Sequence, residues 1–129
     1  TTVTQGDFSY ASGLDAGERL LAQTSPPTAI FASNDDMAAA IVSVAHRQGL
    51  RVPEDLSVVG FDDTTSAVTL WPPLTTVHQP VHQLAKEALQ RVVRAMIIGN
   101  ASYSSTVKRL HVLPHRIIER SSVCAPRRE

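Results

Sequence analysis

The sequence lacks several features that would place it outside the ordinary globular proteins. Cys124 is the only cysteine, so no disulfide can form within the chain, and a reducing compartment is favoured. No apolar run approaches the roughly 18 residues that a membrane-spanning helix requires. Lysine plus arginine and aspartate plus glutamate number 12 each. This balance argues against a basic face that grips nucleic acid. The 129 residues, 43% of them hydrophobic, suffice for one domain with a real core.

Enzyme and metal motifs are also missing. The chain has no G-x-S-x-G elbow, no phosphate-binding glycine loop and no G-x-G-x-x-G, so nucleophilic and nucleotide-dependent enzymes lack support. His78 and His82 are four residues apart, but Pro80 lies between them and no glutamate follows His78 as the zinc-protease motif demands. His111 and His115 have no second pair that would complete a tetrahedral site. We therefore predict no catalytic residue, no metal and no cofactor.

The apolar pattern of the first half predicts alternating strands and helices. Ser9 is placed to cap a first helix, which a proline pair ends. Asn34 or Asp35 caps a second helix, and Gly49 supplies its left-handed stop. Two strand–helix units in succession imply right-handed parallel crossovers. The predicted strands are a short one at residues 1–5 and two buried ones at 28–32 and 56–61.

The second half is predicted to be less regular. Residues 63–73, with threonine, serine and paired prolines, favour a long surface connection, and an extended segment follows at 74–77. Pro80 opens a third helix, whose apolar face is so wide that it must pack against a partner. Glycine and asparagine at 99–100 end that helix. A polar loop at 102–106, strands at 107–113 and 116–120, and a loosely ordered tail from Ser121 to Glu129 complete the prediction.

Polar side chains follow the two buried strands at the points where these strands end. In open α/β sheets, ligands bind beyond the carboxyl ends of the strands. Asn34 offers a donor and an acceptor, whereas ionised Asp62 only accepts, so the pair suits adjacent sugar hydroxyls or the ring nitrogens of a base. Phe8 can stack on a ring face. The alternative is that Asn34 and Asp35 are only helix caps, Asp62 begins a turn, and Phe8 belongs to the core.

The acidic pairs 35–36 and 62–63 leave a second interpretation open. Carboxylates clustered at strand ends can hold Mg²⁺, as in phosphoacceptor receiver domains. A receiver also needs a lysine at a late strand end. The only lysines are Lys86, which falls on a predicted helix, and Lys108.

Five motifs occur in order along the chain: GDFSYASG at 6–13, PTAIFASNDDMAAA at 27–40, GLRVPEDLSVVGFDD at 49–63, PPLTTVHQP at 72–80 and IIERSS at 117–122. Together they resemble the C-terminal part of the LacI/GalR family of transcriptional regulators. The resemblance implies an α/β fold of the type I periplasmic-binding-protein kind. This is a three-layer sandwich with a mostly parallel sheet, in which two subdomains are hinged around an effector.

The resemblance also implies how the chain is divided. Residues 1–74 and 107–122 would form the C-terminal effector-binding subdomain. Residues 75–106 would be a hinge crossover and a helix of the first subdomain, most of which is absent, and residues 123–129 would be a tail. A helix-turn-helix DNA-binding domain would precede this chain.

Individual residues match the family's functional positions. By resemblance, Asn34 and Asp62 touch effector hydroxyls and Phe8 packs on the ligand ring. Asp35 is a weaker match, because such a carboxylate can reach the ligand but also caps the helix. Ala39 and Trp71 are implied at a dimer interface.

The resemblance therefore implies a cytoplasmic, dimeric module that senses a small molecule such as a sugar. This module would belong to a transcriptional regulator that is not an enzyme and that touches DNA only through the preceding domain, without membrane contact. The leading alternative is a secreted sugar-binding protein of a transporter, which shares the fold. The phosphoacceptor domain is the third hypothesis.

Overall fold

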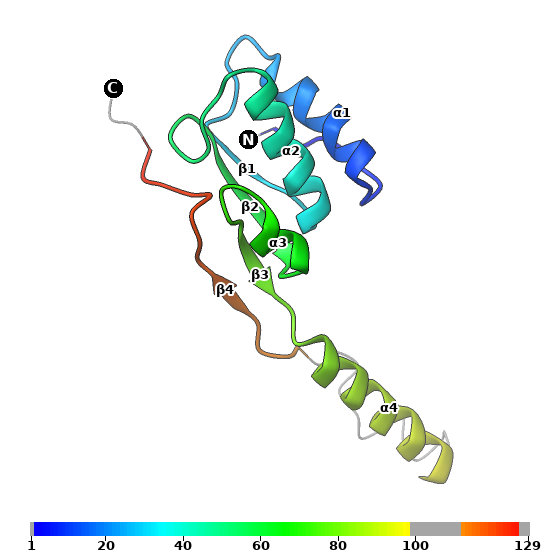
Figure 1. Cartoon of the computed structure of the whole chain (residues 1–129). Coiled ribbons are helices and arrows are strands. Elements are labelled where there is room, and N and C mark those ends of the chain that lie inside the picture. Colours follow the sequence, from blue (N-terminus) through cyan, green and yellow to red (C-terminus); the bar gives the residue numbers. More distant parts are fainter. Residues whose placement is uncertain (1, 99–111, 127–129) are drawn as a thin grey trace. The chain divides into compact units, whose positions relative to one another are not determined.

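The computed structural model describes residues 2–98 and 112–126 (Figure 1). The chain divides into two compact units, Thr1–His78 with Arg116–Glu129 and Gln79–His115. The elements in chain order are α1 (Tyr10–Leu21), β1 (Ala29–Phe31), α2 (Asp35–Arg47), β2 (Ser57–Asp62), α3 (Thr65–Thr69), β3 (Thr75–His78), α4 (Val81–Ile98) and β4 (Arg116–Ile118).

The first unit is built on a four-stranded sheet in the order β1-β2-β3-β4. The pairs β1–β2 and β2–β3 are parallel, whereas β3–β4 is antiparallel. Phe31 of β1 lies opposite Val59 of β2, and Asp62 of β2 lies opposite His78 of β3. The predicted α/β class with a mostly parallel sheet is confirmed.

Local capping signals begin the first two helices and end α2 as predicted, but α1 ends at Leu21, before the proline pair that was expected to end it. The Ser9 side chain accepts from the Ser12 amide at the start of α1. The Asn34 side chain accepts from the Met37 amide at the start of α2, so the cap is Asn34 and the alternative cap Asp35 is wrong. Gly49, just after α2, has φ +75°, the left-handed backbone that glycine adopts without a steric penalty.

The core lies between α2 and the sheet, and α1 packs against α2 (Figure 1). A Cβ atom at Gly13 of α1 would lie only 2.8 Å from the Ala40 Cβ, so glycine is what lets the two helices approach this closely. Burial of apolar surface in this core stabilises the unit, since each large side chain contributes about 1.5–3 kcal/mol. The largest apolar side chains that are fully buried are Leu56, Leu74, Val42, Val44 and Val58.

The structure corrects three predictions about the regular elements of the first unit. Residues 2–5 form no strand, and α3 interrupts the predicted surface connection at 63–73. The strand at 28–32 is shorter than predicted and is buried on one face only, because Ile30 points into the core while Ala29 and Phe31 are exposed.

The prediction of a loosely ordered tail at 121–129 is wrong at its start, and residues 127–129 lie outside the described residues. Ser122 is fully buried; its hydroxyl donates to the Val58 carbonyl at 2.5 Å and accepts from the Thr75 amide at 2.8 Å. The Val58 amide in turn donates to the Ser122 carbonyl at 2.8 Å. A serine side chain that both donates and accepts thus joins β2 to β3, which sequence reasoning from the end of the chain did not anticipate.

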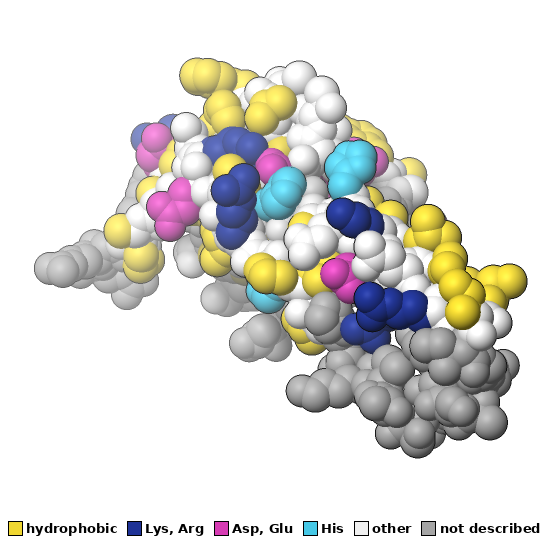
Figure 2. Space-filling view, turned by 90° about the horizontal axis from the view of Figure 1, so that it is seen from below, with side chains coloured by type: hydrophobic (Ala, Val, Ile, Leu, Met, Phe, Trp, Pro, Cys, Tyr) yellow, Lys and Arg dark blue, Asp and Glu magenta, His cyan; other side chains and the backbone are white. Residues whose placement is uncertain are grey.

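The second unit contains α4, which begins directly after Pro80 as predicted. The apolar side chains of α4 are exposed. Figure 2 views the molecule from below and shows hydrophobic, basic, acidic and histidine side chains intermingled on that face. None of the helices in the described part is long and apolar enough to cross a membrane. The helix end at 99–100, the loop at 102–106 and most of the strand at 107–113 lie outside the described residues. The exposed apolar side chains of α4 are Val81, Leu84, Leu89, Val92, Val93, Met96 and Ile97.

Candidate functional site

Asn34 and Asp62 follow neighbouring parallel strands and lie at one edge of the sheet. Phe31 and Val59 are register partners, and Asn34 and Asp62 each come three residues later. Both side chains belong to half-buried residues. The structure therefore brings the two polar strand ends together at the carboxyl edge, which we call the Asn34–Asp62 edge.

Asn34 serves two protein contacts at this edge. Its Oδ1 accepts from the Met37 amide at 2.8 Å, and its Nδ2 donates to the Phe8 carbonyl at 2.8 Å. An amide side chain has a second hydrogen and further lone-pair capacity beyond these two bonds. Asn34 is thus the cap of α2 and also the tether of the loop that precedes α1.

Phe8 stands on that tethered loop and is 64% exposed, so the alternative that it belongs to the core is wrong. Its φ of +67° is uncommon for a bulky residue, and flanking hydrogen bonds hold it there. The Asp7 carboxylate accepts from the Ser9 amide at 3.0 Å and from the Ser9 hydroxyl at 2.5 Å. Hydrogen bonds from the hydroxyls of Ser9 and Ser12 lower the pKa of Asp7 to about 2.

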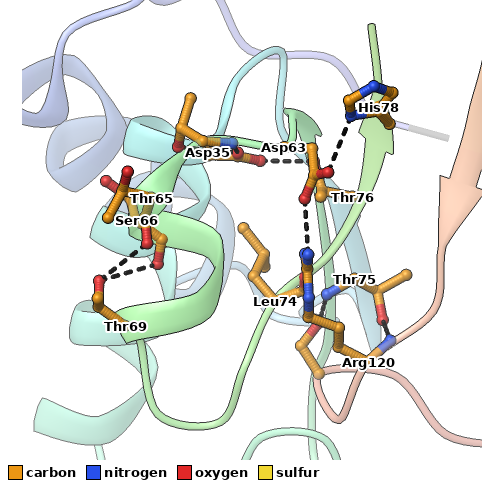
Figure 3. A network of polar contacts seen from close by, with 12 residues as sticks. Asp35, Asp63, Thr65, Ser66, Thr69, Leu74, Thr75, Thr76, His78 and Arg120 are labelled. Atoms are coloured by element: carbon orange, nitrogen blue, oxygen red, sulfur yellow. Dashed lines mark hydrogen bonds and ion pairs between the residues drawn. The ribbon is translucent and has the colours of Figure 1, made fainter.

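Asp62 and Asp63 form a turn with two consecutive left-handed residues, at φ +114° and +58°. In Figure 3 the Asp63 side chain points toward β3 and toward Arg120. Its Oδ1 lies 2.6 Å from Arg120 Nη2, and its Oδ2 lies 2.9 Å from His78 Nδ1. The hydrogen bond from Arg120 lowers the pKa of Asp63; His78 contributes in the same direction, and burial opposes both.

Arg120 extends this cluster to the start of β3. Its Nη1 donates to the Leu74 carbonyl at 2.8 Å, and its backbone amide donates to the Thr75 hydroxyl at 2.9 Å. Sequence reasoning missed Asp63, His78 and Arg120 as a group. The Asp63–Arg120 bond spans 57 positions, and no local pattern indicates a pairing over that separation. We call these three residues the Asp63 cluster.

Asp35 is fully buried behind the Asn34–Asp62 edge. Its Oδ2 accepts from the Thr64 amide at 2.7 Å and from the Thr64 hydroxyl at 3.0 Å, and its Oδ1 accepts from the Thr76 hydroxyl at 2.6 Å (Figure 3). A side chain on residue 60 would collide with this carboxylate, so Gly60 leaves the room that it occupies. This burial contradicts the interpretation of Asp35 as an effector contact, because the carboxylate is inaccessible and both of its oxygens already accept hydrogen bonds from threonines.

The acidic pairs do not assemble into a metal site. Among residues 2–98 and 112–126, no group of three or more His, Cys, Asp or Glu side chains is placed to hold a metal ion. Asp35 faces Thr64 and Thr76, whereas Asp63 faces Arg120 and His78. The acidic cluster that the phosphoacceptor hypothesis requires is therefore not formed by the described side chains.

The two residues expected at a dimer interface lie elsewhere on the first unit. Trp71 is 80% exposed and stands at a surface depression of about 620 Å³, which His46, Pro72 and residues 49–54 also line. Ala39 is half-buried on α2. An exposed tryptophan beside a depression has the chemistry of a protein contact.

Known proteins with this fold and these motifs belong to one family. Residues 2–123 match the family described as "Periplasmic binding protein-like domain". The chain belongs to this family, in the form found in LacI/GalR regulators. The "HTH-type transcriptional repressor CytR" of Escherichia coli (strain K12) is 45% identical over 87 residues, which cover 67% of this chain and 26% of that protein.

Solved structures of LacI-type regulators share the fold. A "transcriptional regulator CelR-cellobiose complex" is 36% identical with a TM-score of 0.79, covering 91% of this chain and 34% of that one. A dimeric Lac repressor with a C-terminal deletion is 34% identical with a TM-score of 0.80, covering 95% and 43%. These relatives are transcriptional regulators. Across the first curated relatives that it matches, this periplasmic-binding-protein-like chain spans only about a quarter to a third of the protein.

Proposed function

We propose that this chain is the effector-sensing and dimerising part of a cytoplasmic, LacI/GalR-type transcriptional regulator, and that it carries no enzymatic activity. The observation that supports the proposal is the parallel register of β1 and β2, because Asn34 and Asp62 each follow a register pair by three residues, and open α/β sheets bind ligands beyond the carboxyl ends of their strands. The relatives, which are regulators, favour this role over that of a transporter's binding protein.

The proposed effector is a sugar or a related hydroxylated metabolite. The Asn34 amide and the Asp62 carboxylate suit hydroxyl groups, and a carboxylate that accepts from a hydroxyl makes a short, strong hydrogen bond. The exposed Phe8 ring supplies an apolar surface for a ring face. The similar CelR structure was solved with cellobiose, which is a ligand of this chemical class.

In this proposal the effector binds between two subdomains. Residues 1–74 and 107–122 form one of them, and the other is a first subdomain that lies outside this chain. Residues 75–106, which begin with β3 of the first unit's sheet, would lead into that subdomain and supply one of its helices. Binding shifts a hinge equilibrium only by the difference in affinity for the two states. The shift changes how a dimer, joined through surfaces that include Ala39 and Trp71, presents its DNA-binding domains. Coupling of about 1–3 kcal/mol is typical of such allostery.

A thermal-shift screen of sugars and purines on the full-length protein would identify the effector, because a ligand that binds the native state raises the unfolding temperature. Calorimetry with the identified compound then tests Asp62. Asp62→Ala should weaken binding about tenfold to a hundredfold, or about 1–3 kcal/mol, through a lost charge-assisted hydrogen bond.

Asp15→Ala is the matched control, because Asp15 is exposed on α1 and is not part of the Asn34–Asp62 edge. Unchanged affinity in Asp62→Ala would reject the role of Asp62.

The 129-residue chain by itself should bind no operator DNA, so sequence-specific binding by this chain alone would contradict the division into domains.

A further inference from the structure

The Asp63 carboxylate joins three separate segments of the first unit. It follows β2 directly, and its two oxygens contact His78 at the end of β3 and Arg120 after β4, at 2.9 Å and 2.6 Å (Figure 3). The Asp63 side chain is only 17% exposed and that of Arg120 only 18%. Partial burial reduces solvent screening, so this ion pair is stronger than a typical surface pair.

Two of those segments lie next to the points where the chain leaves the first unit and returns to it. The first unit ends at His78 and resumes at Arg116. His78 is the last residue of β3, and its register partner is Arg116, the first residue of β4. Arg120 comes two residues after the end of β4. Asp63 therefore contacts the last residue before the chain leaves the first unit, and it contacts Arg120 shortly after the chain has returned.

The turn that carries Asp63 is held on its other side as well. Thr64 donates twice to the buried Asp35 carboxylate, and the backbone at Asp62 and Asp63 is left-handed at both positions. Asp35 also accepts from Thr76 of β3. The turn is therefore tied to β3 by two routes, directly through Asp63 and His78 and indirectly through Thr64, Asp35 and Thr76, and Asp62 immediately precedes both of them.

We propose that Asp63 is a positioning residue, which acts through its contacts with Arg120 and His78. It couples the effector contact at the neighbouring Asp62 to the direction in which the chain leaves the first unit and returns to it. The coupling rests on the proposed effector role of Asp62. The fixing of the two connections by Asp63 can be measured without any effector. Asp63 touches no ligand in this proposal. It holds β3 and the segment after β4 against the turn, and loss of its charge releases both connections together.

The test measures distances between the two units in the full-length protein. Spin labels are attached at Gln23→Cys and Lys86→Cys, after Cys124→Ser and removal of any cysteine outside this chain, and electron–electron resonance gives the distance distribution without ligand. Asp63→Asn should change the ratio of the populated distances about tenfold, which corresponds to about 1.4 kcal/mol. Arg120→Gln should reproduce that change, and the double variant should add little to it.

Asp55→Asn is the matched control. The Asp55 carboxylate also binds an arginine, Arg51, at 2.7 Å and 3.0 Å, and its side chain is similarly covered at 19% exposed, but it lies in the turn before β2. If the pair at Asp63 only stabilised the fold, both variants would lose stability and neither would alter the distances. His78→Gln, at a more exposed position, serves if Asp63→Asn does not fold.

An unchanged distance distribution in folded Asp63→Asn, or in His78→Gln where that variant replaces it, overturns the proposal. An equal change in Asp55→Asn overturns it as well. Failure of the proposed function has a different signature. In that case no sugar or purine would shift the unfolding temperature, while the distances would still respond to Asp63.

Discussion

Asn34 donates from its side-chain Nδ2 to the backbone carbonyl of Phe8 at 2.8 Å, across a separation of 26 positions. The same side chain caps α2, so one residue fixes both the start of a helix and the loop that presents the exposed aromatic ring. The two hydrogen bonds of Asn34 therefore fix the position of Phe8 relative to the start of α2 at the Asn34–Asp62 edge.

Substitutions at Asn34 should separate the two uses. Asn34→Ala should lower the free energy of unfolding by about 1–2 kcal/mol, because the cap and the bond to Phe8 are both lost. Asn34→Asp should cost less, since a carboxylate still caps the helix and only the donor to Phe8 disappears. Urea unfolding of the full-length protein measures both values. An equal loss in the two variants would show that the bond to Phe8, and not the cap, is the main contribution.

Asp35→Ala should be far more destabilising than a surface substitution, by about 3 kcal/mol or more. Bonds to a charged acceptor are worth roughly 1.5–3 kcal/mol each, and the Thr64 and Thr76 donors would lose theirs. Thr76→Val removes one of these bonds and should cost less. Because the two residues share a bond, the double variant should lose less than the sum of the single losses, as urea unfolding can measure. Strict additivity would argue against the bond.

Ser122→Ala should lower the free energy of unfolding by roughly 1–3 kcal/mol. The substitution leaves the Thr75 amide without its serine acceptor and the Val58 carbonyl without its serine donor, inside the protein. Ser121→Ala is the control, because Ser121 is exposed and a substitution there should stay within about 0.5 kcal/mol. Similar small losses in both variants would show that the end of the chain does not secure the sheet.

The acid stability of the protein should depend on Asp63. Its pKa is lowered in the folded state, mainly by the hydrogen bond from Arg120. The resulting stabilisation is complete above the pKa of an unfolded aspartate, about 3.9. It is lost as the pH falls through the lower folded value. The free energy of unfolding of wild type and Asp63→Asn should therefore differ most above that pH and converge below it.

The quantity to follow is the difference in the free energy of unfolding between wild type and Asp63→Asn at each pH. Asp7, with a pKa of about 2, titrates in the same range in both proteins, so its contribution cancels in this difference. Curves that stay parallel down to the lowest pH would contradict a charge-dependent role for Asp63.

Local structure was largely predictable from the sequence. Ser9 and Asn34 are caps because short polar side chains satisfy amides at the start of a helix, and Gly49 ends α2 because glycine tolerates φ +75°. The parallel strands followed from apolar runs separated by a helix. Each of these signals acts over a few neighbouring residues, so the local sequence is enough to predict where a helix or strand begins and ends.

The sequence alone therefore determined the family, the α/β class and the order of the polar strand ends. The tertiary structure decided that Asp35 is buried while Asp62 lies at the edge, that Ser122 joins β2 to β3, and that Asp63 pairs with Arg120. Those outcomes depend on contacts between segments far apart in the chain. The identity of a residue gives its hydrogen-bonding capacity, whereas only the folded backbone selects the partner that uses it.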